Sequence, residues 1–268
     1  MPTHVFVPPN CILDGTAEIT GADFHHLARV LRVRVGERIV LLDNTGFVYN
    51  GKIHRINRHS ITAAGLIREP GPAEQTPAIY LAQAMVRSER MDEVIQLGCQ
   101  VGISAFWPLV TARGMVRWPA DKEAEKLERW RSIAKSAAEQ SKRTRIPNIE
   151  KPLTLAESRQ RYPDALAVLL HPIGSAVSLK RLLNGQTTPP TQILLAVGPE
   201  GGFDPAEIEK AVTLGFQVAS IGKLSARGLH DILLYLWQSA ISMRLAAPRG
   251  RGLLNIPLDR AWRRLIAT

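Results

Sequence analysis

The sequence has few of the features that mark secreted, membrane-spanning or disulfide-stapled proteins. Its 268 residues include two cysteines, Cys11 and Cys99, and no CxxC pair, so neither a disulfide framework nor a structural zinc site is indicated. No apolar run approaches the roughly 20 residues that cross a bilayer, and the first residues lack the basic start and apolar stretch of a signal peptide. We therefore expect a cytoplasmic globular protein without a metal site.

Phosphate-binding motifs are also missing. Neither GxGxxG nor GxxxxGK[ST] occurs in the chain, which argues against a nucleotide-dependent enzyme of the Rossmann or P-loop kind. The sequence does have an excess of positive charge, with Lys+Arg 34 against Asp+Glu 24 and a formal net charge of +10. Such an excess favours binding to polyanions, nucleic acid above all, because phosphates are neutralised on binding.

The chain divides into a small β-rich segment and a larger one in which strands and helices alternate. Residues 1–70 contain two β-prone runs around the turn 43–46, which predict a hairpin, preceded by a short helix. Residues 71–78, rich in proline, predict a linker. Residues 79–248 alternate short apolar runs with amphipathic helices, which predicts a mostly parallel sheet covered by helices on both faces. Residues 249–268 form a basic tail.

The expected elements of the larger segment can be given by residue range. Strands are predicted at 79–85, 103–110, 165–172, 192–200 and 216–222, and helices at 88–102, 121–143, 176–183, 205–214 and 228–247. Ser88 is expected to cap the first of these helices and Gly102 to end it. The last helix is apolar nearly all round, so it must lie deep in its own domain or pack against a second subunit.

The turn between the strand at 192–200 and the next helix is the most informative local feature. Residues 204–207 (DPAE) form a capping box with proline at the first helical position. Residues 198–203 (GPEGGF) therefore cross from strand to helix at the carboxyl edge of the sheet, where ligands bind in open α/β sheets. Gly201 and Gly202 permit close approach of a ligand to the backbone, although such glycines can also serve only to make a turn.

Five segments, taken in order, resemble the RsmE family of SPOUT (trefoil-knotted) methyltransferases. That family methylates N3 of a uridine in small-subunit ribosomal RNA. The likeness covers nearly the whole chain, and the matching segments are 25–46 (HHLARVLRVRVGERIVLLDNTG), 81–116 (LAQAMVRSERMDEVIQLGCQVGISAFWPLVTARGMV), 129–147 (RWRSIAKSAAEQSKRTRIP), 169–172 (LLHP) and 198–203 (GPEGGF).

The resemblance implies a PUA-like β-barrel for RNA at the N-terminus, followed by a knotted α/β domain. It also implies S-adenosylmethionine (SAM) as cofactor, 16S ribosomal RNA or the small ribosomal subunit as partner, and a homodimer with the active site near the subunit interface. The rival interpretation is a non-catalytic RNA-binding paralogue that keeps this fold and its basic surface.

The resemblance also implies the site residues. The cofactor-binding positions are Leu170, His171, Pro172, Val197, Gly198, Pro199, Glu200, Gly201, Gly202, Ser220, Ile221, Gly222, Leu224, Ser225 and Ala226. The positions proposed to contact RNA are Arg29, Arg32, Arg34, Gln140 and Arg143. For these arginines the alternative is an ordinary solvated charge.

The segment after residue 220 departs from the family pattern, which reads like LG-x-RILR-x-ETA. Arg227 matches the second arginine of that pattern, but Leu229 and His230 replace its glutamate and threonine. Leucine can neither accept a hydrogen bond nor take up a proton, so His230 and Asp231 are candidate substitutes. Our hypothesis gives Arg227 the stabilisation of charge on the uracil carbonyls, and Glu200 or a water the removal of the N3 proton.

Overall fold

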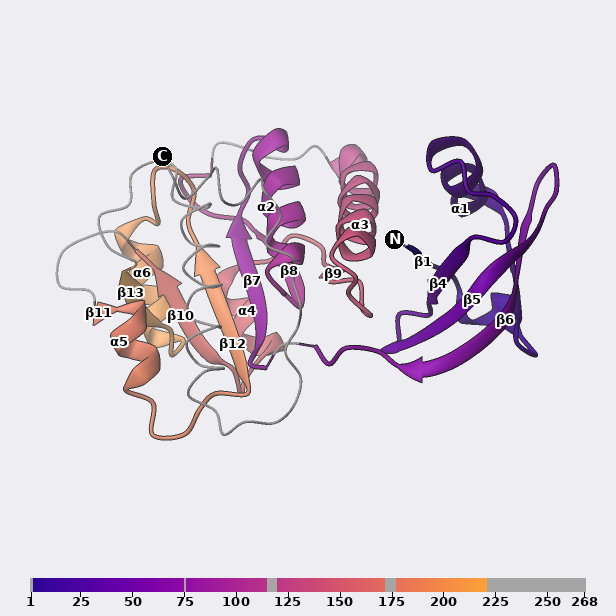
Figure 1. The fold of residues 1–268 in the computed structure, drawn as a ribbon. Helices are drawn as coiled ribbons and strands as arrows, with labels where there is room; N and C mark the ends of the chain where they lie inside the picture. Colours follow the sequence, from indigo (N-terminus) through magenta and orange to yellow (C-terminus); the bar gives the residue numbers. More distant parts are fainter. Residues whose placement is uncertain (1, 75, 115–119, 172–176, 221–268) are drawn as a thin grey trace, which may run out of the picture.

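The computed structural model describes residues 2–74, 76–114, 120–171 and 177–220. These residues form a small N-terminal domain and a larger α/β domain, and Figure 1 shows the small domain beside the long helix α3 (Glu123–Gln140). The predicted fold class, a parallel α/β domain with a β-rich N-terminal domain, is confirmed. The predicted helix at 228–247 and the tail at 249–268 lie outside the described residues.

The N-terminal domain is built on a six-stranded sheet in the order β1-β4-β5-β6-β3-β2. All neighbouring strands are antiparallel except β1 and β4, which run parallel. A short 3-10 turn, η1, precedes β2. The elements are β1 (Thr3–Phe6), η1 (Pro9–Cys11), β2 (Ile12–Leu13), β3 (Thr16–Ile19), β4 (Arg38–Leu42), β5 (Phe47–Ile56) and β6 (Ile61–Pro70).

The predicted hairpin is present, and one carboxylate organises its turn. Buried Asp43 accepts hydrogen bonds from the backbone N–H of Thr45 at 2.8 Å, from the Thr45 hydroxyl at 2.7 Å and from the Tyr49 hydroxyl at 3.1 Å. Burial by itself would raise the pKa of Asp43, but these hydrogen bonds outweigh it and lower that pKa. The turn that joins β4 to β5 is therefore held by an ionised side chain.

The predicted short helix of this domain has an unusual second half. An α-helical turn, α1 (Gly21–His25), continues into a π-helix, η2 (His26–Val30). Phe24, Leu27 and Val30 recur at α-helical spacing, which predicts one buried face; Phe24 and Leu27 are buried, whereas Val30 is 67% exposed. The π-helix has a wider turn than an α-helix, so a residue placed by α-helical spacing no longer faces the core.

The larger domain has a seven-stranded parallel sheet in the order β11-β13-β10-β12-β7-β8-β9. Helices α2 and α3 follow the strands β7 and β8 and pack against each other. The strands are β7 (Ala78–Ala84), β8 (Ala105–Leu109), β9 (Asn148–Ile149), β10 (Leu166–Leu170), β11 (Val177–Ser178), β12 (Gln192–Val197) and β13 (Gln217–Ser220). The helices are α2 (Ser88–Gln100), η3 (Ala120–Lys122), α3, α4 (Leu155–Arg161), α5 (Leu179–Asn184) and α6 (Pro205–Thr213).

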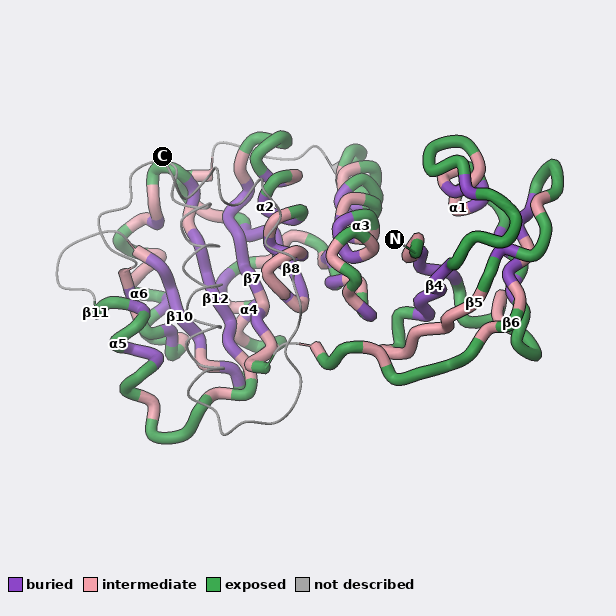
Figure 2. Tube along the Cα trace, in the orientation of Figure 1, coloured by how far each residue is buried: buried purple, intermediate pink, exposed green. Residues whose placement is uncertain are grey.

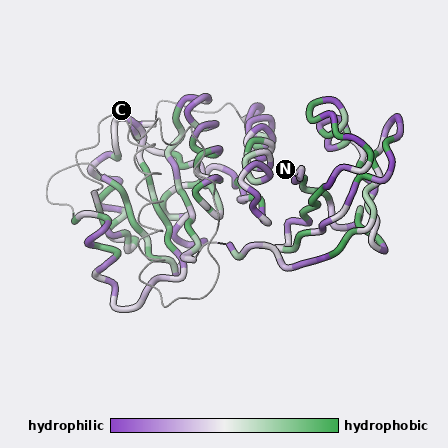
Figure 3. Tube along the Cα trace, in the orientation of Figure 1, coloured by the Kyte–Doolittle hydropathy of each residue, from purple (hydrophilic) through white to green (hydrophobic). Residues whose placement is uncertain are grey.

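The strands of this sheet read as continuous apolar runs because both faces are covered. Leu81, Val168 and Leu195 belong to a core that includes Trp130 of α3. Their neighbours along the strands point to the other face, where Phe203 and Phe216 lie in a second core. Figure 2 shows these strands buried almost throughout, and Figure 3 shows the same strands as hydrophobic. A parallel sheet buried on both faces produces this pattern.

The helix predictions differ from the structure at the cap of α2, in the unpredicted helix α4, and at residues 177–178, which were predicted as helix and form strand β11 before α5. Ser88 is the first residue of α2, and the residue before the helix is Arg87, which makes no side-chain cap. Gly102 lies just beyond the helix with a φ of 97°, so its predicted role at the stop is confirmed. Helix α4 was not predicted, although Thr154 and Glu157 form a full capping box at its start. Its shortness, seven residues, leaves little periodicity to detect.

The two domains meet through an apolar cluster and two polar contacts. Phe6, Val40 and Leu42 of the small domain are buried against Ala137 and Ala138 of α3. The backbone N–H of Phe6 donates to Oε1 of Glu139 at 2.9 Å, and Lys135 pairs with Asp23 at 2.5 Å. Because both domains contribute buried groups, their relative orientation is set by packing rather than by the linker alone.

Candidate active site

Three segments predicted from separate parts of the sequence lie next to one another at the carboxyl edge of the parallel sheet. Leu170, the last residue of β10, is in register with Val197 at the end of β12. On its other side Leu170 is in register with Ala219 of β13, and the backbone N–H of His171 donates to the Ala219 carbonyl at 2.9 Å. The three apolar side chains are buried. The predicted strand-end positions therefore form one continuous floor.

The glycine loop after β12 folds back over this floor. The N–H of Gly202 donates to the carbonyl of Pro199 at 2.8 Å, and Gly202 has a φ of 69°, which glycine adopts without strain. A Cβ built on Gly198 would lie 3.1 Å from the ring of Phe203, so a side chain there would require Phe203 to move by a few tenths of an ångström. A Cβ on Gly202 would lie 3.9 Å from the His171 ring. These contacts place the loop against the end of β10.

The helix that follows the loop starts at the predicted capping box. The Asp204 side chain accepts from the N–H of Ala206 at 3.1 Å, and Glu207 accepts from the N–H of Asp204 at 2.9 Å. The other oxygen of Glu207 accepts from the N–H of Ala112 at 2.8 Å. One carboxylate thus caps α6 and also holds the segment that follows β8.

Arg113 makes a second tie between that segment and the glycine loop. Its guanidinium donates to the carbonyl of Gly201 at 3.2 Å and pairs with Asp204 at 3.3 Å. Sequence reasoning did not assign a role to Arg113 or to the second contact of Glu207. No local pattern could have shown either, because the partners lie about ninety residues apart in the chain.

Three buried polar atoms at this edge lack a hydrogen-bond partner within the described part of the chain. They are Oε1 of Gln83 in β7, Oγ1 of Thr111 after β8 and Nδ1 of His171 after β10. Gln83 is only 3% exposed and is in register with Val197. An unpaired buried polar group is costly, so such atoms mark places where a ligand can supply the missing partner. Gln83 was not among the predicted site residues.

The remaining predicted cofactor positions divide into two groups. Glu200 is exposed in the turn, and Ser220 is half-buried at the end of β13. Arg227, Leu229 and His230 lie outside the described residues. So do the other predicted cofactor positions, which are Pro172, Ile221, Gly222, Leu224, Ser225 and Ala226. Across the described ranges, no group of three or more His, Cys, Asp or Glu side chains is placed to hold a metal ion. In the same ranges no helix has the length and hydropathy that crossing a membrane would need.

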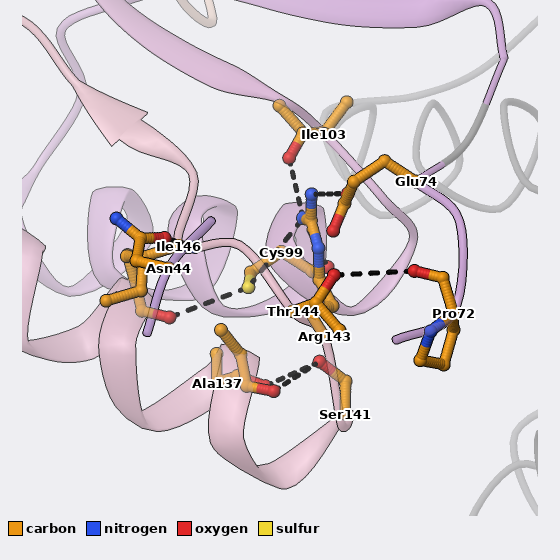
Figure 4. Close-up of polar contacts among 12 residues, drawn as sticks. Asn44, Pro72, Glu74, Cys99, Ile103, Ala137, Ser141, Arg143, Thr144 and Ile146 are labelled. Carbon is orange, nitrogen blue, oxygen red and sulfur yellow. Dashed lines mark hydrogen bonds and ion pairs between the residues drawn. The ribbon is translucent and has the colours of Figure 1, made fainter. Parts of the chain in front are cut away.

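The residues predicted to contact RNA do not share one environment. Arg29, Arg32 and Arg34 are exposed on the small domain, where the π-helix ends. Gln140 is exposed at the last residue of α3. The side chain of Arg143, in contrast, is only 9% exposed, and Figure 4 shows it pointing into the protein among the end of α2, the linker and the end of α3.

The contacts of Arg143 explain its burial. Its guanidinium donates to the carbonyls of Cys99 at 3.1 Å and Ile103 at 2.7 Å, and it pairs with Glu74 of the linker at 2.5 Å. The donors of this side chain are thus directed to groups within the protein. We therefore assign Arg143 to holding the linker against the larger domain and remove it from the RNA-facing set.

Comparisons with known proteins identify the family. An RNA methyltransferase domain matches residues 73–225, and an RNA methyltransferase PUA domain matches residues 19–64. Ribosomal RNA small subunit methyltransferase E of Synechocystis sp. is 33% identical over 232 residues, with 85% of this chain and 74% of the relative covered. The chain belongs to the ribosomal RNA small subunit methyltransferase E family. The Mycobacterium bovis protein of that name is 30% identical, with 84% of this chain and 90% of the relative covered.

Solved structures show the same architecture as this chain. The methyltransferase E of Neisseria gonorrhoeae, bound to S-adenosyl methionine, aligns with a TM-score of 0.79 at 28% identity, covering 89% of this chain and 96% of that one. A Legionella pneumophila protein solved with SAM aligns with a TM-score of 0.79 at 26% identity, covering 89% and 98% of the two chains. The predicted family and fold are confirmed.

Proposed function

We propose that this protein uses SAM to methylate N3 of a specific uridine in 16S ribosomal RNA of the small subunit. The observation that carries the proposal is the carboxyl-edge floor, where the ends of β10, β12 and β13 come together beside the GPEGGF loop in a chain of the methyltransferase E family. We also propose that it works as a homodimer, because the apolar segment 228–247 needs cover on most sides, and that it is cytoplasmic, because its proposed substrate is ribosomal RNA.

The described residues suit a nucleoside-containing cofactor. Leu170 and Val197 offer apolar surface for a planar base, and the glycines of the loop leave the backbone accessible. The unpaired atoms of His171, Thr111 and Gln83 offer polar partners at the same edge. SAM, when bound, supplies an electrophilic methyl group on a sulfonium, so correct positioning of the uridine accounts for much of the acceleration.

The chain must also remove the proton that N3 of uridine carries. We give this role to Glu200, which lies exposed in the loop turn, either directly or through a water. Arg227 would stabilise the negative charge that develops on the uracil carbonyls. The loop is tied to the segment after β8 by Arg113 and to α6 by the capping box, so Glu200 is carried on a supported turn.

Single-turnover methylation of small-subunit ribosomal RNA by purified protein tests this scheme. We expect Glu200→Gln and Arg227→Ala each to slow the methyl-transfer step by about a hundredfold or more, while SAM still binds. An unimpaired rate in either variant would remove that residue from the mechanism.

The rival proposal, a non-catalytic RNA-binding paralogue, draws on Leu229 and His230, which replace a glutamate and a threonine of the family pattern. Calorimetric titration with SAM separates the two proposals. Absence of SAM binding at about millimolar concentration, together with intact RNA binding, would favour the paralogue. Mapping the methylated nucleotide in the treated RNA would identify N3 of uridine or exclude it.

A further inference from the structure

The outer face of the small domain continues beyond its contact with α3. Along β4, Ile39 and Leu41 point into the domain's own core, whereas Val40 and Leu42 pack on α3. Because strand side chains alternate, Arg38 lies on the α3-facing side as well. The register pairs Arg38 with Lys52 on β5. One half of this face is thus an interdomain contact, and the other half presents two cations.

The half that α3 leaves open is hollowed. A groove of about 500 Å³ is lined by Pro2, Arg38, Asn50, Lys52, Ala64 and Gly65, among others. A second hollow of about 390 Å³ adjoins it and shares Lys52, Ala64 and Gly65. The second hollow adds Val35, Gly36 and His54. The two hollows adjoin along Lys52, Ala64 and Gly65, and we call them together the β4–β5 groove.

The floor of the β4–β5 groove is made of residues with small side chains or none, and it is open. Gly65 has a φ of 65°, and a Cβ built there would meet nothing within 4 Å. Ala64 beside it carries a single methyl group. Small residues leave room for another polymer backbone to lie along the floor, whereas the walls carry the long cationic side chains.

The charges of the groove are mainly positive. Arg38 and Lys52 are exposed, and neither takes part in an ion pair of the described residues. The acidic exceptions are Glu69, which accepts from the wall residue Asn50 at 3.0 Å, and Glu37, next to Arg38 in the chain. Val35 lines the end of the groove that lies away from Pro2, and Arg34, already predicted to contact RNA, directly precedes it in the chain.

The near end of the groove reaches the α/β domain. His4 hydrogen-bonds to the carbonyl of the wall residue Pro2 at 3.2 Å. Burial lowers the pKa of His4, and the charge of Lys142, just beyond α3, lowers it further. Lys142 is exposed. Phe6 of β1 packs on Ala137 and Ala138 near the end of α3, so Lys142, just beyond α3, lies beside the strand that carries His4. Its cation therefore adds positive charge on the side of the joint that belongs to the α/β domain.

We propose that the β4–β5 groove binds the phosphate backbone of the substrate RNA, and that Lys142 continues this contact across the joint between the domains. The proposal rests on the proposed function in taking ribosomal RNA as the ligand. Unpaired cations on both sides of a small-residue floor suit a polyanion rather than an apolar or a cationic partner. Since Glu139 and Lys135 fix the joint, RNA in this groove is held at a set position relative to the active site.

RNA binding by full-length variants tests the proposal. Fluorescence anisotropy with transcribed small-subunit RNA is measured from about 50 to about 300 mM KCl for the double variant Arg38→Gln/Lys52→Gln. We expect about tenfold weaker binding and a salt dependence lowered by about 1.5 in the log–log slope, because two phosphate contacts are lost. Lys142→Asn should lower the slope by about 0.7, and asparagine tolerates the positive φ of 57° at this position.

The matched control is Arg58→Gln, which removes an exposed cation from the turn between β5 and β6, outside the lining of either hollow. It should bind RNA as the unaltered protein does, and thermal unfolding checks that all variants are folded. Unchanged RNA binding by the double variant overturns the proposal. Loss of binding to assembled small subunits with unchanged binding to naked RNA also overturns it, in favour of an acidic ribosomal protein.

Methylation assays on the same variants separate this proposal from the proposed function. If the unaltered protein binds RNA through the groove and transfers no methyl group, the groove proposal stands and the proposed function fails. If the double variant methylates RNA with an unchanged KM, the proposed function stands and the groove proposal fails.

Discussion

Arg143 and Glu74 form an ion pair of 2.5 Å that joins the end of α3 to the linker between the domains. The same guanidinium donates to two carbonyls at the end of α2 and beyond it. A single side chain therefore connects three segments that are distant in the sequence. Its partners are buried or half-buried, so losing it would leave polar groups without hydrogen bonds.

We expect Arg143→Ala to lower the free energy of unfolding by about 2–4 kcal/mol, since the carbonyls of Cys99 and Ile103 lose their donor. Urea-induced unfolding followed by circular dichroism measures this change. Arg131→Ala is the control, because Arg131 makes an exposed pair with Glu128 and only a long contact of 3.5 Å with the Ile149 carbonyl, so it should matter little. Equal effects of the two substitutions would contradict the anchoring role.

Glu139 should make the stability of the domain joint depend on pH. Burial raises the pKa of its carboxyl above the ordinary value of 4.5, although the N–H of Phe6 partly offsets this. The native state therefore binds this proton more tightly than the unfolded state, and its contribution to stability falls as pH rises through the raised pKa. We expect Glu139→Gln, which keeps an oxygen for Phe6, to flatten the pH dependence above 4.5 and to be at least as stable at about pH 7.

Unfolding measured by denaturant at several pH values checks the prediction for Glu139. Glu139→Ala is the companion variant, because it removes both the charge and the acceptor for the Phe6 N–H, and it should be less stable than Glu139→Gln. The contrary result is a gain in stability of the unaltered protein relative to Glu139→Gln as the pH rises. The folded protein would then favour the ionised carboxylate, and the pKa of Glu139 would be lowered, which contradicts the prediction.

The two thiols should react very differently. Cys99 is buried, and burial raises the pKa of its thiol to about 11, which leaves about one thiolate in a thousand at about pH 8. We expect one thiol per chain to react with Ellman's reagent in the folded protein and both in guanidinium chloride. Cys11→Ser should abolish the fast reaction. A second fast thiol in the folded protein would show that Cys99 is accessible.

Glu207 should affect the cofactor site as well as its own helix. Glu207→Ala removes one half of the capping box of α6, leaving the Asp204 cap, and also the contact with Ala112, at a cost of about 1 kcal/mol or more in stability. Because the glycine loop then loses part of its support, we expect SAM to bind about three- to tenfold more weakly by calorimetry. Glu157→Ala, which removes the equivalent cap of α4, is the control. It should leave SAM binding unchanged, and equal weakening would contradict a local effect.

Much of the larger domain followed directly from the sequence. Buried parallel strands need apolar side chains on both faces, so runs such as 192–197 could be recognised without knowing their neighbours. The capping box at 204–207 also fixed the start of α6, because its hydrogen bonds are local and depend on residue types at set spacing. The linear order of family motifs predicted which strand ends would form the floor.

Long-range contacts could not be read from the sequence. Arg143 looked like a basic residue available to RNA, and only the packing of α2, α3 and the linker shows that it is buried. The same holds for Arg113 and Gln83, whose surroundings come from other strands. The exposure of Val30 depends on a π-helical turn that changes the spacing.

The sequence by itself determined most of the elements, the family and the strand-end motifs, because these rest on local periodicity and on residue types at fixed spacing. The tertiary structure alone decided which charged side chains remain exposed and which are buried. It also decided that the open half of the small domain's outer face lies next to α3. Burial and charge proximity depend on neighbours that are far apart in the chain, and those neighbours exist only once the two domains have packed together.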